Sequence, residues 1–301
     1  MKLSALRYLV AFSDQLSFSR AAEQCQVSHP SLSVALQRLE EELGVILIDR
    51  SKHHMSLTEV GERMVTQARK SLEEVGCIET VAQSGKDPLD DTFRLGIIHT
   101  IAPYLLPDLI PALHRVAPGL TLYIEESMTA LLADYLKYGT VDGAIVALPF
   151  DIPGIATQAL YDEVFEVAVP KGHPWAARKH IGASEIGSED VLVLKAGNCF
   201  REQVLDACPE ISHTNTSRHQ GHSIETIRAM VASGYGISVL PKSALSELYQ
   251  SDLVVSIPFE DPPPLRRVAL AWRRSSVHEK VVQVLLQAVH AMNKSAYKIV
   301  H

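Results

Sequence analysis

The sequence predicts an α/β protein with an N-terminal winged helix-turn-helix, a long linker helix and a larger C-terminal α/β domain of two lobes. Two patterns lead to this prediction. Apolar residues over 3–44 follow the spacing of two short helices and a longer third one. From residue 92, short apolar runs alternate with helix-length segments. A chain of 301 residues is long enough to hold two hydrophobic cores.

Composition and charge exclude one simple mode of nucleic-acid binding. The chain is 47% hydrophobic and 21% charged, which is typical of a soluble globular protein. Its net charge is −7, and residues 1–88 hold ten Lys or Arg against twelve Asp or Glu, a net charge of −2. Binding through bulk positive charge is therefore excluded, and any DNA contact must come from a local patch.

The chain is expected to be cytoplasmic. It has no run of about eighteen apolar residues that would cross a membrane. The apolar stretch after Lys2 is interrupted by Arg7 and lacks a small-residue cleavage site, so it is not a signal peptide. In a reducing compartment, cysteines serve as buried thiols, metal ligands or redox sensors rather than as a disulfide framework. The cysteines are Cys25, Cys77, Cys199 and Cys208.

Two short helices are predicted first. One runs from Leu3 to near Asp14, and the next spans 18–24, with Ser17 or Ser19 as its N-cap. A turn at 26–27 follows, and the order of elements is that of a helix-turn-helix.

The third helix is the predicted recognition helix. Ser28 is its N-cap, Pro30 fits the first turn and Gly44 ends it. One face is apolar, comprising Leu32, Leu36, Leu39 and Leu43. The other residues are small near the start and polar further on, which suits a helix entering the DNA major groove. The candidate DNA-contacting residues of this helix are His29, Pro30, Ser31, Ser33, Val34, Gln37 and Arg38.

A small β-hairpin follows the third helix. Residues 47–49 and 55–57 are its predicted strands, and 50–54 form its turn. Arg50 and Lys52 make this wing basic and supply local positive charge for phosphate contacts. His53 and His54 are expected in the same wing, facing solvent or phosphate.

Amphipathic spacing alone leaves open a plain three-helix bundle. The linear pattern A-A-E-Q-C-Q-V-S-H-P-S-L-S-V-A-L-Q-R-L-E-E-E-L-G-V-I-L-I-D-R, from Ala21 to Arg50, closely resembles the LysR-type signature along its whole length. The resemblance implies binding to a double-stranded DNA operator. His29 stands where the family usually has Gln, and Val34 where a more polar residue is common, and both are expected to change operator preference.

A long helix is predicted after the wing, with Thr58 as its cap and Glu59 in its first turn. Its apolar residues form a narrow seam that suits pairing with a second copy, although Glu79 interrupts it. The seam comprises Val65, Ala68, Leu72, Val75 and Ala82. The alternative is a helix packed on its own domain, and we favour pairing. Gly85 to Pro88 resembles a hinge.

The family resemblance implies a division of the chain and a set of partners. Residues 1–58 would be the DNA-binding domain, 59–88 the dimerising linker, and 89–301 the regulatory domain. The implied assembly is a homodimer to homotetramer on a two-fold operator. RNA polymerase is a further partner implied by the resemblance, and no cofactor is expected.

The C-terminal domain is predicted as two α/β lobes. Strands are expected at 93–98, 120–124 and 143–147, then at 163–169, 191–194, 236–240 and 268–272. Helices are expected at 106–116, 200–207 and 223–232. Lobe I would hold about 89–162 and 268–301, and lobe II about 163–267. Lobes joined by crossing strands make a periplasmic-binding-protein-like architecture, in which ligands bind in the cleft beyond the carboxyl ends of strands.

Three strand-to-helix junctions carry the candidate site residues. Thr100 follows the first strand, Thr129 follows the second, and Cys199 precedes a predicted helix. Helix N-termini hold anions or polar ligands, so a small molecule or ion is expected at this point.

The two cysteines of the C-terminal domain lie at the two ends of one predicted helix. The helix dipole favours thiolate at Cys199, and Arg201 is close in sequence. Cys208 is roughly 13 Å away at about 1.5 Å rise per residue, whereas a disulfide needs Cα atoms within about 7 Å. Bond formation would therefore require unwinding. Taken without the resemblance, the residues favour buried thiols with no chemistry.

A second resemblance reverses that preference. The segments L-K-A-G-N-C-F-R-E-Q-V-L-D-A-C (194–208) and L-G-I-I-H-T-I-A-P-Y-L-L-P (95–107) resemble the redox centre of peroxide-sensing LysR-type regulators. This implies a reversible disulfide in which Cys199 is the peroxidatic thiol and Cys208 the resolving thiol. It also implies that Thr100 and Thr129 position hydrogen peroxide and that Arg266 stabilises the thiolate. The remaining candidate peroxide- or effector-binding residues are Asn198, Arg201 and Glu202.

Two positions depart from that pattern. Asn198 replaces the usual His, and it cannot carry a proton. Glu202 replaces Asp, which keeps the carboxylate on a longer arm. Both changes are expected to slow peroxide reduction without abolishing sensing.

Other functions remain open. A LysR-type regulator could respond instead to a small effector, often a carboxylate, bound between the lobes. A thiol peroxidase is a weaker alternative, and we expect a regulator that is not an enzyme. His219 and His222 lack further ligands at suitable spacing, so no metal site is predicted.

Overall fold

The structure is a computed structural model that describes residues 1–50, 55–83, 89, 92–213, 220–276, 278–292 and 297–300. The chain divides into two compact units, Met1–Lys86 and Asp87–His301. Lys52, His53, His54, Gly85 to Pro88 and His219 lie outside the described residues, as do the side chains of Cys77, Glu79 and Ala82.

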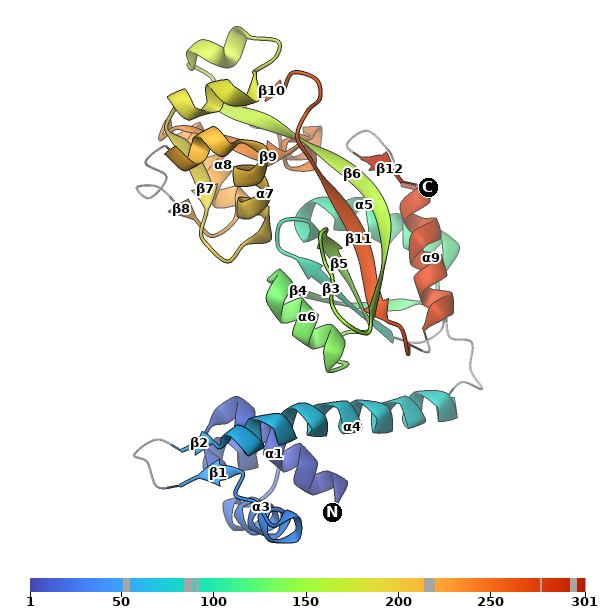
Figure 1. The fold of residues 1–301 in the computed structure, drawn as a ribbon. Coiled ribbons are helices and arrows are strands. Elements are labelled where there is room, and N and C mark those ends of the chain that lie inside the picture. Colours follow the sequence, from blue (N-terminus) through green and yellow to red (C-terminus); the bar gives the residue numbers. More distant parts are fainter. Residues whose placement is uncertain are drawn as a thin grey trace. The chain divides into compact units, whose positions relative to one another are not determined.

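The first unit is a winged helix-turn-helix (Figure 1). Helices α1 (Leu3–Gln15), α2 (Phe18–Gln24) and α3 (His29–Leu43) pack around a small core, and α4 (Glu59–Gln83) follows. Strands β1 (Ile48–Asp49) and β2 (Ser56–Leu57) pair antiparallel as the wing. The core includes Leu9, Phe12, Leu32, Leu36, Leu39 and Leu47.

The helix ends follow from local chemistry, as predicted. Ser17 rather than Ser19 caps α2, and its side chain accepts a hydrogen bond from the Arg20 N–H at 3.5 Å. Ser28 caps α3 in the same way, accepting from the Ser31 N–H at 3.3 Å. Gly44 ends α3 with a φ of 68°, in the left-handed region that glycine adopts without strain. Of the predicted apolar face of α3, Leu32, Leu36 and Leu39 are buried, whereas Leu43 at the end of the helix is 37% exposed.

The linker helix α4 packs on its own domain over its first half. Thr58 caps it as predicted, accepting from the Gly61 N–H at 3.0 Å. Val65 and Ala68, assigned from the sequence to a pairing seam, are buried, and Val65 belongs to the core of the first unit. This part of the prediction is therefore corrected, because these residues are buried within their own unit, in which α1 lies alongside α4. An ion pair between Arg69 and Asp14 joins the same two helices.

The second unit is built on one mixed β-sheet with the strand order β4-β3-β5-β11-β6-β9-β7-β8. Strand β3 (Thr92–Ile98) pairs in parallel with β4 (Thr121–Ser127) and β5 (Gly143–Ala147). The long strands β6 (Ile155–Pro170) and β11 (Leu265–Arg273) run antiparallel to each other and cross between the lobes (Figure 1). Strands β7 (Val191–Leu194), β8 (Gln220–Gly221) and β9 (Ile237–Pro241) continue the sheet in lobe II.

Helices and outer strands complete the second unit. The helices are α5 (Ala102–Val116), α6 (Thr129–Lys137), α7 (Cys199–Ala207), α8 (Ile224–Ala232) and α9 (Glu279–His290). Strands β10 (Val254–Pro258) and β12 (Lys298–Ile299) both pair with β6. Short 3-10 turns lie at 174–177, 183–188, 209–213, 242–245 and 247–249. The sequence analysis placed Thr129 at the start of a helix but gave no bounds for α6. It lacked α9, β8, β10 and β12, and it recovered only 163–169 of β6.

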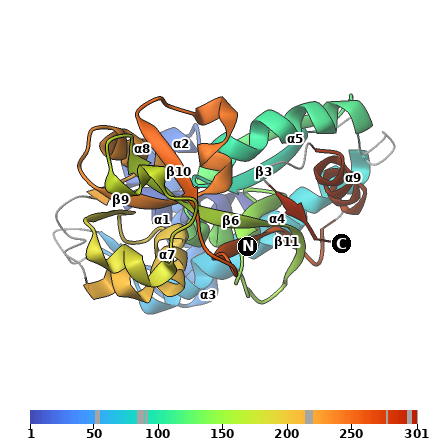
Figure 2. The same cartoon turned by 90° about the horizontal axis from the view of Figure 1, so that it is seen from above.

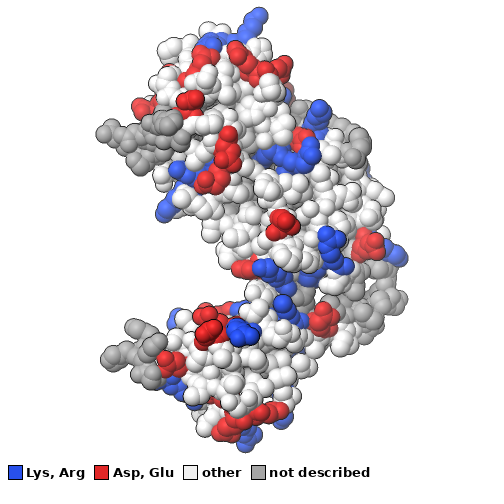
Figure 3. All heavy atoms as spheres, viewed as in Figure 1, with Lys and Arg blue, Asp and Glu red and all other residues white. Residues whose placement is uncertain are grey.

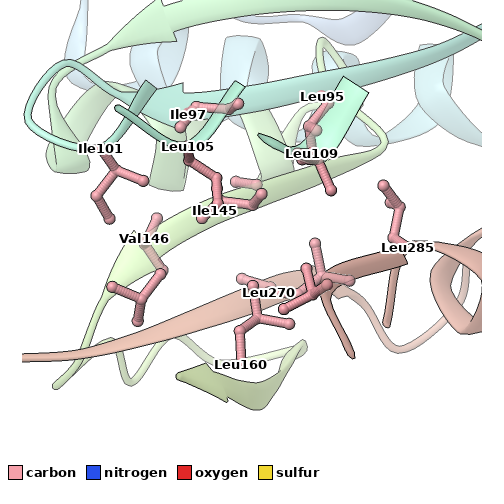
Figure 4. Close-up of a cluster of buried hydrophobic side chains, with 14 of the residues drawn as sticks. Leu95, Ile97, Ile101, Leu105, Leu109, Ile145, Val146, Leu160, Leu270 and Leu285 are labelled. Carbon is pink, nitrogen blue, oxygen red and sulfur yellow. The ribbon is translucent and has the colours of Figure 1, made fainter. Parts of the chain in front are cut away.

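Each lobe has its own core. In lobe I, apolar side chains from β3, β5, β6 and β11 meet those of α5 and α9, as Figure 4 shows for Leu95, Leu105, Ile145, Leu270 and Leu285. Helices α5 and α9 pack against each other (Figure 2). In lobe II, α7 and α8 cover β7 and β9, and Cys208 belongs to this second core.

The described surface carries mixed charge. On the face drawn in Figure 3, acidic and basic side chains of each unit are interspersed rather than gathered into one patch of a single sign. Among the described residues, no helix combines the length and the apolar character needed to span a bilayer.

Candidate functional site: a thiol pocket between the lobes

Cys199 is the first residue of α7, and the preceding turn sets its position. Gly197 has a φ of +93°, in the left-handed region that favours glycine. Asn198 caps the helix, and its side-chain oxygen accepts a hydrogen bond from the Phe200 N–H at 3.1 Å. The half-buried Cys199 thiol therefore lies at the positive end of the α7 dipole.

The predicted junctions meet at one small pocket of about 10 Å³, which is roughly the space of a single water molecule. The turn after β3 contributes Thr100, the start of α6 contributes Thr129, and the turn before α7 contributes Asn198 and Cys199. The remaining lining residues are Ile98, His99, Ser127, Met128 and Gly197. Four of the sequence-predicted site residues thus line one cavity.

A buried charge network lies behind Thr100. Arg266 on β11 donates from Nη1 to the Thr100 hydroxyl at 3.0 Å and from Nη2 to the Thr100 carbonyl at 2.8 Å. Its Nε donates to Glu163 Oε2 at 2.7 Å. The guanidinium also lies 5.2 Å from the centre of the Phe200 ring. Arg266 therefore connects the first turn of α7 with Thr100.

Arg201 and Glu202 do not line the pocket. The Arg201 Nη1 donates to the Leu194 carbonyl at 2.9 Å, and its Nε lies 3.9 Å from Glu202 Oε1. The Glu202 side chain is largely exposed. Although both residues follow Cys199 closely in sequence, the helical rotation of α7 directs them elsewhere.

Cys208 is at the other end of α7, fully buried in the lobe II core. Burial in apolar surroundings raises the pKa of its thiol from 9.0 to about 11. Both Cys199 and Cys208 are free thiols in this structure. Cys199 is the first residue of the nine-residue helix α7 and Cys208 is its C-cap, so this is the reduced arrangement.

Sequence reasoning missed Glu163, His99 and Ser127. Glu163 was assigned to a buried strand, and no local pattern distinguished it as a partner of Arg266, which is 103 positions away in sequence. The available signal was a carboxylate within a predicted buried strand, since buried charges need partners, but Glu166 of the same strand carries the same signal. His222 is exposed, and the described residues contain no cluster of metal-ligating side chains.

A second site is on α3 of the first unit. Its candidate DNA-contacting residues are exposed except for Ser33, which is half-buried. Arg50 of the wing is exposed but paired, with its Nη2 donating to Glu40 Oε2 at 2.8 Å. Glu40 Oε1 also accepts from the Leu47 and Ile48 N–H groups at 2.8 and 3.0 Å, which fixes the wing to α3.

Comparison with known families identifies the two domains that carry these sites. Residues 3–62 match the model for a bacterial regulatory helix-turn-helix protein of the lysR family, and residues 86–294 match the LysR substrate binding domain. The chain belongs to the LysR family, and it is a DNA-binding transcription regulator rather than an enzyme.

Two individual relatives are similar to this chain over more than 90% of its length. The DNA-binding transcriptional dual regulator OxyR of Escherichia coli K12 is 35% identical over 291 residues, covering 97% of this chain and 95% of the relative. A hydrogen peroxide-inducible genes activator of Dickeya chrysanthemi is 36% identical over 276 residues, covering 92% of this chain and 90% of the relative.

Solved structures of OxyR have the same fold. A full-length cysteine-to-aspartate variant from Pseudomonas aeruginosa is similar with a TM-score of 0.79 and 43% identity, covering 100% of this chain and 98% of that one. An oxidized OxyR from Corynebacterium glutamicum has a TM-score of 0.58 and 30% identity, covering 96% of this chain and 92% of that one.

Proposed function

We propose that this regulator senses hydrogen peroxide through a reversible disulfide between Cys199 and Cys208. The observation that carries the proposal is the Cys199 thiol at the start of α7, beside a cavity of about 10 Å³ that the Thr100 side chain also lines. A cavity of this size suits a very small polar molecule better than a metabolite. The relatives are described as peroxide-inducible activators, which supports the same chemistry.

The proposed chemistry has two balanced steps. The Cys199 thiolate attacks one oxygen of hydrogen peroxide, the O–O bond breaks, and with one proton the products are Cys199 sulfenic acid and water. The Cys208 thiol then attacks the sulfenic sulfur, forming the disulfide and releasing a second water. Thr100 and Thr129 hydrogen-bond the peroxide, and Arg266 stabilises the thiolate through its position behind Thr100.

Formation of the bond is coupled to a structural change. Cysteines at the two ends of α7 are roughly 13 Å apart along the helix axis, at about 1.5 Å per residue, so α7 must unwind before the sulfurs meet. Cys208 must also leave the lobe II core, where it is fully buried. The rearrangement of α7 changes the surface of lobe II and thereby the assembly that carries the DNA-binding units.

DNA binding is the role of the first unit in this proposal. The exposed residues of α3 read an operator in the major groove, and the basic wing contacts phosphate. Pairing through the second half of α4 places two such units on a two-fold operator, in a homodimer or homotetramer that acts on RNA polymerase in the cytoplasm.

A direct test traps the sulfenic acid. The Cys208→Ser variant treated with one equivalent of hydrogen peroxide should be modified by dimedone at Cys199, and Cys199→Ser should not. Cys25→Ser serves as the matched control and should react like the wild type, because Cys25 lies in the other unit. Absence of a dimedone adduct at Cys199 would contradict the proposal.

One observation favours a second candidate function. A larger cavity of about 460 Å³, within the usual size range for ligand pockets, is lined by residues that include Leu148, Gln203, Asp206, Pro264 and Arg267. A small effector bound there could regulate DNA binding without thiol chemistry. In that case the double variant Cys199→Ser/Cys208→Ser would respond to the effector as the wild type does.

A further inference from the structure

We propose that Glu163 is a positioning residue for the peroxide step: it holds Arg266 in the orientation that turns the Thr100 hydroxyl hydrogen toward the Cys199 pocket. The inference rests on the proposed peroxide chemistry. It concerns a residue of the crossing strand β6 that does not line the pocket.

The Glu163–Arg266 ion pair is buried away from water, and hydrogen bonds fix its orientation. The side chains of Arg266 and Glu163 are 0% and 1% exposed. Glu163 Oε2 accepts from Arg266 Nε at 2.7 Å, and Glu163 Oε1 accepts from the Ser243 N–H at 3.3 Å. A carboxylate bonded at both oxygens has one orientation, so it fixes the direction of the guanidinium plane.

The direction of the guanidinium decides how Thr100 can act. A threonine hydroxyl has one hydrogen to donate and two acceptor lone pairs. Arg266 Nη1 uses one lone pair at 3.0 Å, and Nη2 holds the Thr100 carbonyl at 2.8 Å. The guanidinium carries only donors, so the hydroxyl hydrogen must point away from it. Because Thr100 lines the pocket, that hydrogen is available to a peroxide oxygen.

A hydrogen bond donated by the Thr100 hydroxyl favours the attack of the Cys199 thiolate on hydrogen peroxide. When the thiolate attacks, negative charge develops on the departing peroxide oxygen, and a fixed O–H donor stabilises that charge. Without Glu163, Arg266 would be a buried cation with no carboxylate at ion-pair distance among the described residues. Such a charge recruits water or reorients, and the Thr100 hydroxyl would lose its fixed direction.

Two reagents separate this role from general structural support. Hydrogen peroxide needs both the thiol and the hydroxyl donor, whereas iodoacetamide alkylates the thiol without an oxygen leaving group. Glu163→Gln should slow Cys199 oxidation by peroxide roughly 10-fold to 100-fold, less than the full loss of an oxyanion donor. Both rates are expressed per Cys199 thiolate, whose fraction in each variant is measured by ultraviolet absorbance, because Arg266 also stabilises the thiolate. The rate of Cys199 alkylation per thiolate should then change less than about twofold, because the donor is not used.

Glu166→Gln is a matched control on the same strand. Glu166 is also buried, but its partners are Lys242 at 3.6 Å and Ser256 rather than Arg266. It should leave both rates unchanged. Glu163→Asp keeps the charge on a shorter arm and should give an intermediate loss, which supplies a second test if Glu163→Gln does not fold.

A double-mutant comparison completes the test. In a Thr100→Val background, Glu163→Gln should slow peroxide oxidation no further, because its effect passes through the hydroxyl. The inference is overturned if a folded Glu163 variant reacts with peroxide at the wild-type rate, or if both reagents slow in parallel. If the wild-type protein itself does not react with peroxide, the proposed function fails instead.

Discussion

Cys199 and Cys208 lie at the two ends of the same helix, with Cys199 as the first residue of α7 and Cys208 as its C-cap. The helix places one thiol at the positive end of its dipole and holds the other at its far end. The proposed disulfide therefore requires this same helix to unwind.

Unwinding of α7 should be visible as faster amide exchange. In the oxidised protein, residues 200–207 should lose protection, because their backbone hydrogen bonds must open for the sulfurs to meet. Hydrogen–deuterium exchange of reduced and oxidised protein measures this, with α8 as an internal control. Unchanged protection of α7 in a protein with a verified disulfide would contradict the coupling.

The buried thiol of Cys208 makes stability depend on alkaline pH. Its pKa is about 11 in the folded chain against the ordinary 9.0. Between these values the unfolded chain loses the proton first, so stability falls as the pH rises. The expected loss is roughly 1 to 1.5 kcal/mol between pH 8 and 10.

Urea unfolding under reducing conditions measures that loss. Trp175 and Trp272 are the two tryptophans of the chain and both lie in the second unit, so their fluorescence reports on it. Cys208→Ala should have a lower free energy of unfolding at pH 8 but a flatter dependence on pH. Equal slopes for the two proteins would show that Cys208 does not carry the effect.

Arg38 on α3 should contribute to DNA affinity through phosphate. Arg38→Ala should weaken binding to all sequences and lower the slope of log affinity against log salt by about 1. Arg115→Ala, an exposed arginine of α5 in the second unit, is the matched control and should change neither. Fluorescence anisotropy with a duplex selected by the wild-type protein measures both the DNA affinity and its dependence on salt.

Glu40 should stabilise the wing through its three hydrogen bonds. Glu40→Ala leaves the Leu47 and Ile48 N–H groups and Arg50 without this acceptor, which should cost about 1 to 3 kcal/mol of the first unit's stability. Glu41→Ala, the exposed neighbour, should cost far less. Calorimetry of the full chain measures the stability of the first unit from its own unfolding transition. Equal losses of stability in Glu40→Ala and Glu41→Ala would contradict the role of Glu40.

The second half of α4 should carry the pairing between chains. Ile78 is 67% exposed, although it is a large apolar residue on a helix. Ile78→Glu should shift the protein toward monomer in sedimentation velocity, whereas Gln67→Glu on the same helix should not. An unchanged oligomer in Ile78→Glu would move the interface elsewhere.

Local signals predicted the first unit well. Ser17, Ser28, Thr58 and Gly44 act within a few residues of their own position, so the sequence alone places the helix ends. The α4 seam was misjudged because Val65 and Ala68 are buried within their own unit, where α4 packs on elements distant in sequence such as α1. Amphipathic spacing shows that a face is covered, but it does not identify what covers it.

In the candidate site too, residues marked by local sequence signals were predicted and residues that depend on distant contacts were not. The strand-to-helix junctions of Thr100, Thr129 and Cys199 could be read from neighbouring residues, and they meet at one pocket. Glu163 could not be found, since its bond to Arg266 depends on the pairing of β6 with β11. Arg201 was misplaced because sequence proximity to Cys199 does not fix the direction of a side chain on a helix.

The most direct test of the redox switch is mass spectrometry of thiol-blocked protein after brief treatment with stoichiometric hydrogen peroxide. The wild-type protein and Cys25→Ser should contain a Cys199–Cys208 bridge within seconds to minutes, and Cys199→Ser and Cys208→Ser should not. If both thiols of the wild-type protein stay reduced until peroxide is in large excess, the account is contradicted.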